Sequence, residues 1–300
     1  MKIIVLGGGN SPERAVSLRS AAAVAKALRT AGYEVVEVDP ADGFDALESA
    51  PKDTLVFPVL HGAGGEDGSL QSTLDKYGLR YLGSSAEVAK LCFDKDLARK
   101  KMAAAGIAVA KGESVSKETY PYHPLSKVPH VLKAQRGGSS IGTYIVRDPL
   151  KINQAKVAEV FELDELAIIE ELIGGPEITV PILDTKALPV IEIVPPVSEE
   201  FNYENKYNGK SQEICPAVSL NAQQQEEAQR LAEKVHNVLG CRHLSRVDIM
   251  LRTNGEMVVL EANTMPGMTE QSLYPLSAKV AGMPMPELMK SFVDLVTKNK

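Results

Sequence analysis

Residues 246–269 read RVDIMLRTNGEMVVLEANTMPGMT, and this stretch decides how the chain can be organised. Asn254 and Gly255 stand between two apolar runs, and this dipeptide tolerates the positive φ that a two-residue type I′ turn requires. The pattern therefore predicts an antiparallel hairpin in which Thr253 pairs with Glu256.

Counting outward from that turn brings four polar side chains onto one face of the hairpin, because side chains alternate with a period of two. The count places Asp248 opposite Glu261. Two positions further from the turn, Arg246 stands opposite Asn263. Apolar residues occupy the remaining positions: Val247, Ile249, Leu251, Val258 and Leu260 fill the other face, while Met250 and Val259 share the carboxylate face.

Two opposed carboxylates on this face need an explanation. Directly opposed residues have Cβ atoms roughly 4.5–5.5 Å apart, and like charges at that distance destabilise a sheet. A solvated polar face is the usual alternative, but the half-apolar surroundings disfavour it. Asp248 and Glu261 must then be protonated, paired with Arg246, or bridged by a cation. With the amide oxygen of Asn263 they form an oxygen-only set that suits magnesium, and this is the interpretation that the residues favour.

The composition sets the class of protein. The 300 residues, 44% of them hydrophobic, can form a large core and two or three domains. The net charge is −6 and the basic residues are scattered, so neither nucleic acid nor an anionic membrane surface is an expected partner. The opening run KIIVLGGG is too short for a signal-peptide core, and no membrane span is expected. Three widely spaced cysteines fit reduced thiols, so we expect a cytoplasmic protein.

The first ninety residues predict an α/β unit. Its expected elements are strands at 2–6, 34–38 and 54–60 and a helix at about 16–31. Gly7-x-Gly9 lacks the third glycine of a dinucleotide fingerprint because Pro12 stands in its place, which disfavours a dehydrogenase. His61 opens a glycine-rich turn beyond the third strand, where α/β sheets bind ligands. Glu13 begins the helix, where a lone glutamate is more often a helix-dipole partner than a ligand contact.

A change in composition near residue 90 marks the first domain boundary, and a second candidate site follows it. Lys133 ends an apolar strand and precedes the glycine and serine loop 136–142, whose N–H groups and hydroxyls can cover phosphates. The loop is not a Walker A motif, because Gly142 is followed by Thr143. A plain hairpin loop would explain the glycines but not a lysine inside an apolar strand.

Two further features have open interpretations. Glu171 and Glu177 flank a bend and could bind an exocyclic amine and a ribose diol, or they could be edge-strand charges that discourage aggregation. The residues alone favour the edge-strand interpretation. Residues 195–218 form a long irregular loop rich in aromatic side chains, which we interpret as a closing lid.

Eight motifs follow one another along the chain at compatible spacings: GGNSPERAVSL, LHGAGGEDG, DK-x3-RK, K-x3-GGSSIG, EELIGGPEITV, YENKY, SRVDIML and LEANTMPGMT. Together they resemble the D-alanine–D-alanine ligases of the ATP-grasp superfamily over essentially the whole chain. The resemblance implies an α/β protein with a three-domain ATP-grasp architecture. Residues 1–90 would form a Rossmann-like substrate-binding domain, residues 91–180 the central ATP-grasp subdomain, and residues 181–300 the C-terminal subdomain with metal site and lid.

The resemblance also implies a reaction. ATP would phosphorylate the carboxylate of one D-alanine, and the amine of a second would attack the acyl phosphate to give the dipeptide, ADP and phosphate, for peptidoglycan precursors. The expected cofactors are ATP and two magnesium ions, with manganese able to substitute. The expected partners are D-alanine, ATP and a second copy of the chain in a homodimer.

Site residues carry over by position. The resemblance implies that ATP contacts Lys95, Lys133, Ser139, Glu170, Glu171, Ile173, Glu177 and Lys206. The metal ions would be held by Asp248, Glu261 and Asn263, as the hairpin count also indicates. Arg246 and the backbone of Gly267 would stabilise the oxyanion, and Glu13, His61 and Ser272 would bind the amino acids. Glu13, Ser139 and Tyr207 match a hydrogen-bonded trio that links the first domain, the glycine loop and the lid.

Some positions depart from the family pattern. Gly137 stands where an acid is frequent, Ala134 replaces a proline, and Leu172 replaces an aromatic residue, so these positions bear on nucleotide affinity. Tyr207 favours alanine over lactate as the second substrate. Two alternatives stay open at this point: a ligase with D-serine, D-lactate or another amino acid as second substrate, and a nucleotide-binding module without turnover.

Overall fold

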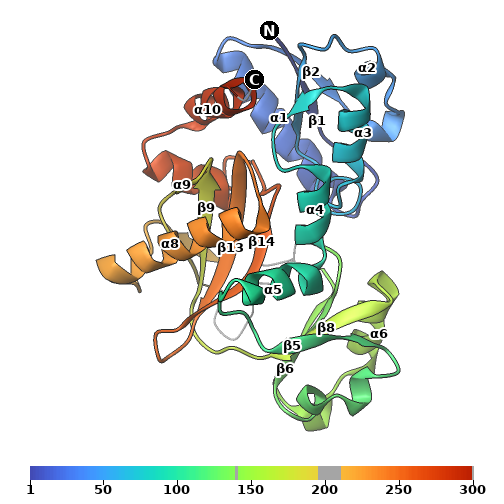
Figure 1. Cartoon of the computed structure of the whole chain (residues 1–300), viewed down its shortest axis with the longest axis vertical. Helices are drawn as coiled ribbons and strands as arrows, with labels where there is room; N and C mark the ends of the chain where they lie inside the picture. The colour runs from blue at the N-terminus through green and yellow to red at the C-terminus, as the bar shows by residue number, and fades with distance from the viewer. Residues whose placement is uncertain (139–140, 195–210, 299–300) are drawn as a thin grey trace.

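Three β-sheets follow one another along the chain in the computed structural model, which describes residues 1–138, 141–194 and 211–298. In Figure 1 the N-terminal sheet lies at the top, the C-terminal sheet in the middle and the central sheet at the bottom. We name the three parts the N-terminal, C-terminal and central units after these sheets. The α/β class predicted from the sequence is confirmed.

The N-terminal sheet is parallel and has the strand order β2-β1-β3-β4. Its strands are β1 (Lys2–Leu6), β2 (Glu34–Val38), β3 (Leu55–Pro58) and β4 (Arg80–Tyr81), and its helices are α1 (Arg14–Thr30), α2 (Asp45–Glu48) and α3 (Ser69–Tyr77), with a short 3-10 turn η1 (Pro40–Asp42). β1 and β3 are almost continuously apolar because they lie in the middle of a sheet that is covered on both faces. His61 follows the carboxyl end of β3.

Two short helices lead to the central unit. α4 (Ala86–Phe93) ends where α5 (Lys95–Ala104) begins, and Asp94 caps α5 by accepting from the N–H groups of Asp96 and Leu97. The central sheet is antiparallel, in the order β5-β8-β6-β7. Its elements are β5 (Gly112–Ser116), β6 (His130–Ala134), β7 (Thr143–Val146), β8 (Leu166–Glu171), α6 (Gln154–Leu163) and the 3-10 turns η2 (Tyr120–Tyr122), η3 (Pro124–Lys127) and η4 (Pro149–Lys151).

One face of the central sheet is apolar and the other carries charge. Leu132 and Ala134 pack with Val157 and Val160 of α6. Because side chains alternate along a strand, Lys133 points to the opposite face, away from the helix. The lysine that ends an apolar strand is thus aimed at the C-terminal unit.

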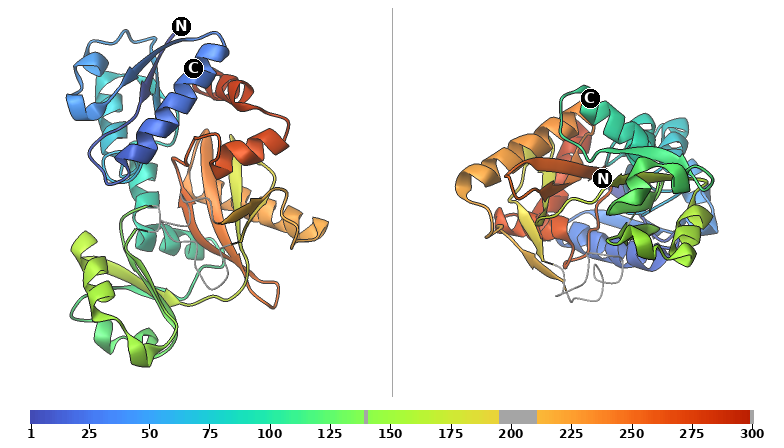
Figure 2. Two further views of the ribbon diagram at one scale, coloured as in Figure 1. Left: turned by 180° about the vertical axis from the view of Figure 1, so that it is seen from behind. Right: turned by 90° about the horizontal axis from the view of Figure 1, so that it is seen from below.

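The C-terminal sheet has the order β12-β11-β9-β13-β14, with β10 paired to β9. Its elements are β9 (Glu177–Leu183), β10 (Lys186–Ala187), β11 (Ile191–Val194), β12 (Gln212–Ile214), β13 (Leu244–Leu251), β14 (Met257–Asn263) and helices α8 (Ala222–Leu239), α9 (Leu273–Val280) and α10 (Met285–Lys298). α8 covers one face through Ala228, Ala232 and Val235. α10 returns to the N-terminal unit and packs beside α1 (Figures 1 and 2), so one hydrophobic core joins these two units.

The hairpin β13–β14 has the predicted register at the site and a different one at the turn. Asp248 pairs with Glu261 and Arg246 with Asn263, as expected. The turn, however, has three residues, since Arg252 N–H bonds to the Glu256 carbonyl. A β-bulge after Asp248 restores the count.

The bulge also corrects the predicted faces of β14. Val259 pairs with Ile249 and belongs to the core under α8, whereas Val258 pairs with Met250 on the carboxylate face. Leu260, the extra residue of the bulge, lines the same pocket as Asp248 and not the opposite face. Our assignment of these three side chains was wrong because the added residue lies on β14 and has no counterpart on β13. The alternation of β14 is therefore shifted between the bulge and the turn.

The edge-strand interpretation of Glu171 and Glu177 was also wrong. Glu171 ends β8 and Glu177 begins β9, and both strands lie inside their sheets with a neighbour on either side. Cys92, Cys215 and Cys241 are free thiols. Among the described residues, no helix is long and apolar enough to cross a membrane.

Candidate active site

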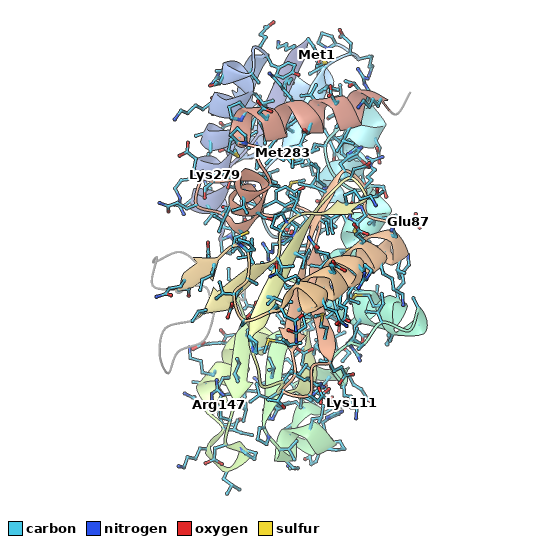
Figure 3. The ribbon with its side chains drawn as sticks, turned by 90° about the vertical axis from the view of Figure 1, so that its left-hand side faces the viewer. Met1, Glu87, Lys111, Arg147, Lys279 and Met283 are labelled. Atoms are coloured by element: carbon cyan, nitrogen blue, oxygen red, sulfur yellow. The ribbon has the colours of Figure 1, made fainter. Side chains whose placement is uncertain are left out.

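A pocket of about 600 Å³ lies between the charged face of the central sheet and the carboxylate face of the C-terminal sheet. The central unit contributes Val131, Lys133, Thr143, Ile145, Arg147 and Glu170, and the C-terminal unit contributes Glu177, Ile193, Asp248, Met250, Leu260 and Glu261. Arg147, which follows the last residue of β7, is one of these lining residues and is labelled in Figure 3. The pocket therefore has cationic and acidic groups on facing walls.

Lys133 and Lys95 are cations of this pocket, and the family resemblance assigns both to ATP. Lys133 Nζ lies 2.6 Å from Glu170 Oε1, and both side chains are buried. Lys95 Nζ donates to the Gly137 carbonyl at 2.5 Å, which ties the first turn of α5 to the glycine loop. Burial lowers the pKa of Lys95 from its ordinary value. Both ammonium groups are held by short contacts, and both face the same cavity.

The segment after β8 forms the wall at the other end of the pocket. Glu171 has its own partners, because its carboxylate lies 2.6 Å from Arg252 and its N–H donates to the Lys111 carbonyl. Leu172 and Ile173 contribute their apolar surface to the pocket, and Glu177 lines it from β9. An apolar wall between two carboxylates suits a flat base and a polar sugar.

The carboxylate hairpin is partly neutralised by its own arginine. Arg246 makes two bonds to Asp248, from Nε at 2.8 Å and from a terminal nitrogen at 2.7 Å. Thr179 on β9 donates its hydroxyl to the same carboxylate at 2.5 Å. Of the three options for these acids, pairing with Arg246 is thus present for Asp248.

The other two members of the predicted oxygen set are arranged differently. Glu261 is half-buried and lines the pocket opposite Asp248. The side-chain oxygen of Asn263 accepts the N–H of Met265 at 2.8 Å, so it also shapes the loop that follows β14. Within the described residues, no group of three or more His, Cys, Asp or Glu side chains is arranged to hold a metal ion.

Three groups of the N-terminal unit meet at the end of β3. His61 is 6% exposed, and burial lowers its pKa to about 4, so the ring is neutral at physiological pH. Glu66 accepts the Gly62 N–H at 2.6 Å. Burial, with the nearby Glu13 carboxylate, raises the pKa of Glu66 to about 8. A side-chain carbon at Gly138 would lie 3.3 Å from Glu66 Oε2 and 3.4 Å from Glu13 Oε2, so the glycine loop rests against both acids.

The loop after β14 brings Gly267 close to Ser272. A side-chain carbon at Gly267 would lie 3.0 Å from Ser272 Oγ, so only glycine fits without movement of the serine. Ser272 is the N-cap residue that precedes α9, and its hydroxyl lies 2.8 Å from the hydroxyl of Thr269. The N–H of Met268 reaches Ser20 Oγ at 3.5 Å, which joins this loop to α1.

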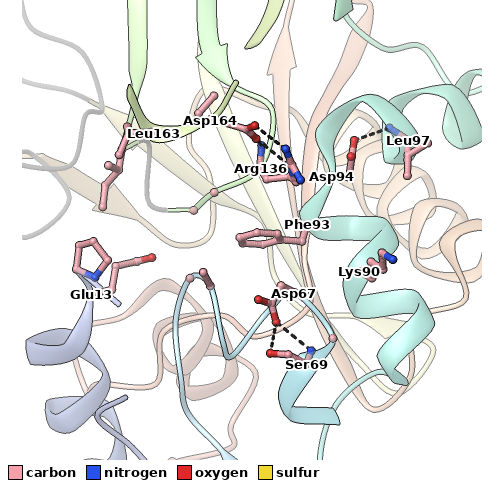
Figure 4. A pocket seen from close by; sticks show the side chains of 18 of the residues that line it. Glu13, Asp67, Ser69, Lys90, Phe93, Asp94, Leu97, Arg136, Leu163 and Asp164 are labelled. Carbon is pink, nitrogen blue, oxygen red and sulfur yellow. Dashed lines mark hydrogen bonds and ion pairs between the residues drawn. The ribbon is translucent and has the colours of Figure 1, made fainter. Parts of the chain in front are cut away.

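A second, larger cavity of about 1210 Å³ opens between the N-terminal and central units. Figure 4 shows Phe93 of α4 projecting into it between Asp67 and the ion pair of Arg136 with Asp164. Glu13 lies on the opposite side of the same cavity. The cavity therefore reaches the Glu13 side chain.

Eight of the predicted site residues line the pocket of about 600 Å³: Lys95, Lys133, Glu170, Glu171, Ile173, Glu177, Asp248 and Glu261. Glu13 lines the larger cavity. The other described ones, His61, Arg246, Asn263, Gly267 and Ser272, line neither of these two cavities. Ser139, Lys206 and Tyr207 lie outside the described residues. The sequence patterns did not indicate Thr179, Glu66 or Arg147 as site residues. Thr179 is a polar residue in the middle of an apolar strand, which was a usable signal, and Glu66 lies in the quoted glycine-rich turn.

Comparison with known proteins decides the family. A family model described as D-ala D-ala ligase C-terminus matches residues 102–294. A protein of Methylacidiphilum infernorum named D-alanine–D-alanine ligase is 40% identical over 98% of this chain and 94% of its own length. The chain belongs to the D-alanine–D-alanine ligase family.

Solved structures of the D-alanine–D-alanine ligase family match the whole fold. The Bacillus anthracis D-alanine–D-alanine ligase complexed with ATP has a TM-score of 0.84 and 32% identity, covering 99% of this chain and 97% of that one. The VanG D-Ala:D-Ser ligase from Enterococcus faecalis has a TM-score of 0.82 and 29% identity, covering 99% of both chains. The ATP-grasp architecture predicted from the sequence is therefore confirmed.

Proposed function

We propose that this protein joins two molecules of D-alanine in an ATP-dependent reaction that supplies D-alanyl-D-alanine to peptidoglycan precursors. The observation that carries the proposal is the pocket between the two sheets, which sets Lys133 of the central sheet and Lys95 of α5 against Asp248 and Glu261 of the C-terminal hairpin. A carboxylate is a poor electrophile, so its activation needs phosphate contacts, metal and exclusion of water together.

We infer one orientation for ATP in this pocket. Its phosphates belong beside Lys95, Lys133 and the glycine loop, with Ser139 on that loop and Lys206 from the lid as further contacts. Its adenine belongs at the wall of Glu170, Glu171 and Ile173, and its ribose beside Glu177. In this orientation the terminal phosphate faces the hairpin.

The residues of the hairpin fit magnesium by their chemistry. Asp248, Glu261 and Asn263 offer oxygen atoms only, and Mg²⁺ prefers a few carboxylates completed by substrate phosphates and water. With this preference, two carboxylates and an amide are a sufficient contribution from the protein. Bound magnesium would neutralise phosphate charge during transfer, and Arg246 would then turn from Asp248 toward the reacting carboxylate.

The two D-alanines belong on either side of the loop that contains Gly267. Glu13 would hold the ammonium of the first, while neutral His61 supplies a hydrogen bond near the acyl phosphate without adding charge. The amine of the second attacks the acyl carbon, phosphate leaves, and the attacking nitrogen gives up its proton. Arg246 and the Gly267 N–H would stabilise the oxyanion that forms in between.

Ser272 and the start of α9 suit the carboxylate of the second D-alanine. A helix N-terminus favours an anion, and Ser272 makes no side-chain cap to its own helix. The trio of Glu13, Ser139 and Tyr207 would close the lid over both substrates and exclude water. We also infer the division into residues 1–90, 91–180 and 181–300, a homodimer and a cytoplasmic location, which analytical ultracentrifugation and cell fractionation can test.

The proposal is tested by phosphate release from ATP and magnesium in the presence of D-alanine, L-alanine, D-lactate or D-serine, with products identified by mass. We expect release that requires D-alanine and yields D-alanyl-D-alanine. D-Serine as a mixed second substrate would assign the chain to the activity for which the VanG ligase is named. Binding of ATP without release under any condition would contradict the proposal.

A further inference from the structure

Thr269 is joined to Ser272 by three hydrogen bonds. The N–H of Thr269 donates to Ser272 Oγ at 3.1 Å, and the two hydroxyls lie 2.8 Å apart. In the return direction, the N–H of Ser272 donates to the Thr269 carbonyl at 2.9 Å. These contacts fix the Ser272 side chain relative to the loop that contains Gly267.

Ser272 is placed as a helix cap but does not act as one. Its backbone angles, φ −75° and ψ 151°, are those of an N-cap residue. An N-cap serine normally accepts the N–H of the second or third helical residue, and here the third residue is Pro275, which has no N–H. The hydroxyl makes no capping bond and is turned toward Thr269 instead. Helix capping therefore does not explain why this serine is held so closely.

The bonds from Thr269 allow the Ser272 hydroxyl to donate its proton to an anion. A serine hydroxyl has one proton and two lone pairs. The Thr269 N–H occupies one lone pair, and the Thr269 hydroxyl can donate to the other, which leaves the Ser272 proton free to donate outward. A carboxylate favours this arrangement. In the reverse arrangement, in which Ser272 donates to the Thr269 hydroxyl, the carboxylate would face a lone pair of the Ser272 oxygen.

We propose that Thr269 is a positioning residue for the second D-alanine, because its N–H and hydroxyl hold the Ser272 hydroxyl as a hydrogen-bond donor to the carboxylate of that substrate. The proposal rests on the role proposed above for Ser272. Thr269 touches Ser272 and not the reacting atoms, so its effect appears in acceptor binding and not in phosphoryl transfer.

The test compares T269V, which replaces the hydroxyl by a methyl group of similar size, with T269S, which keeps it. Dipeptide formation as a function of D-alanine concentration gives one Michaelis constant for each D-alanine. Trapping of the acyl phosphate by hydroxylamine reports the donor half-reaction alone. We expect T269V to raise the acceptor constant about fivefold to tenfold, with kcat within about twofold and the hydroxylamine reaction unchanged. T269S should restore the acceptor constant.

A double-mutant cycle with S272A separates positioning from general support of the loop. If Thr269 acts through Ser272, T269V/S272A has the same acceptor constant as S272A. Additive effects, an unchanged constant in T269V, or a failure of T269S to restore it would overturn the proposal. An S272A variant with a normal acceptor constant would instead refute the role of Ser272 itself. Thermal denaturation of each variant confirms that it is folded.

Discussion

Glu261 is the residue on which the metal assignment depends most, because Asp248 already has Arg246 and Thr179 as partners. We predict that Glu261→Gln lowers kcat by at least about a hundredfold, since it removes charge from the metal site and leaves the core intact. The same substitution at Glu256, on the half-exposed end of the same hairpin, is the matched control and should be nearly neutral. Steady-state kinetics and circular dichroism decide, and a folded Glu261→Gln variant with normal turnover would refute the assignment.

Substitutions at the buried pair of Lys133 and Glu170 can distinguish an effect on stability from an effect on nucleotide binding. Removing one partner of a buried ion pair leaves an uncompensated charge, so Lys133→Met or Glu170→Gln alone should cost roughly 3 kcal/mol in the free energy of unfolding. The double variant should recover most of that loss but bind ATP weakly, because the phosphate contact is still missing. Urea denaturation and calorimetric titration with ATP measure the two effects. A double variant with normal ATP affinity would contradict the role of Lys133.

In the hairpin β13–β14, the pairing of Arg252 with Glu256 and the bulge between Asp248 and Ile249 together place Asp248 opposite Glu261, so this register does not depend on the length of the turn. Deleting Thr253 shortens the loop to Asn254-Gly255 and keeps the pairing of Arg252 with Glu256, so Asp248 stays opposite Glu261. We predict activity within about twofold of the parent protein. Deleting Ala262 instead would place Asn263 opposite Val247 and should abolish activity. Loss of activity on deletion of Thr253 would show that the turn itself contributes to the site.

The hairpin also illustrates what the sequence can predict. The alternation of side chains located the facing carboxylates correctly, although the turn was one residue longer than expected and the bulge cancelled that error. The bulge left no signal, because Leu260 has the composition of an ordinary strand residue. Val258 and Val259 were accordingly assigned to the wrong faces. The period-two pattern thus located the paired polar residues of the hairpin, but it did not locate the apolar residues between them and the turn, because one extra residue reverses their faces.

For the molecule as a whole, local sequence patterns could not predict the order of the strands in each sheet. Glu171 and Glu177 look like edge charges in the sequence, yet both strands are interior, because their neighbours come from distant segments. The facing of two sheets across one pocket likewise depends on tertiary contacts that periodicity does not encode. The family resemblance supplied the arrangement that local patterns could not.

Four buried histidines make the stability of the whole molecule sensitive to acid. His61, His130, His236 and His243 are each at most 6% exposed, and burial lowers the pKa of all four, to about 4 for His61, His236 and His243. Their ordinary value of 6.5 applies in the unfolded chain. As pH falls below 6.5 the unfolded chain binds protons that the folded protein does not, so stability is lost down to about pH 4. Each of the three histidines with a folded pKa of about 4 can account for up to roughly 3 kcal/mol.

Glu66 opposes this trend, because its folded pKa of about 8 lies above its ordinary value of 4.5, and it gains stability for the folded state as pH falls between these values. Burial also raises the pKa of Glu213, which acts in the same direction as Glu66. The four histidines outnumber these two acids, so we predict a net loss of stability between pH 6.5 and pH 4.5. His236→Gln, which removes the ring that bonds to Ser245, should flatten the curve, and Glu66→Gln should steepen it. Urea unfolding at pH 4.5, 5.5, 6.5 and 7.5, without nucleotide or metal, measures these slopes. Parallel curves for His236→Gln and the parent protein would contradict the assignment of the acid sensitivity to buried histidine.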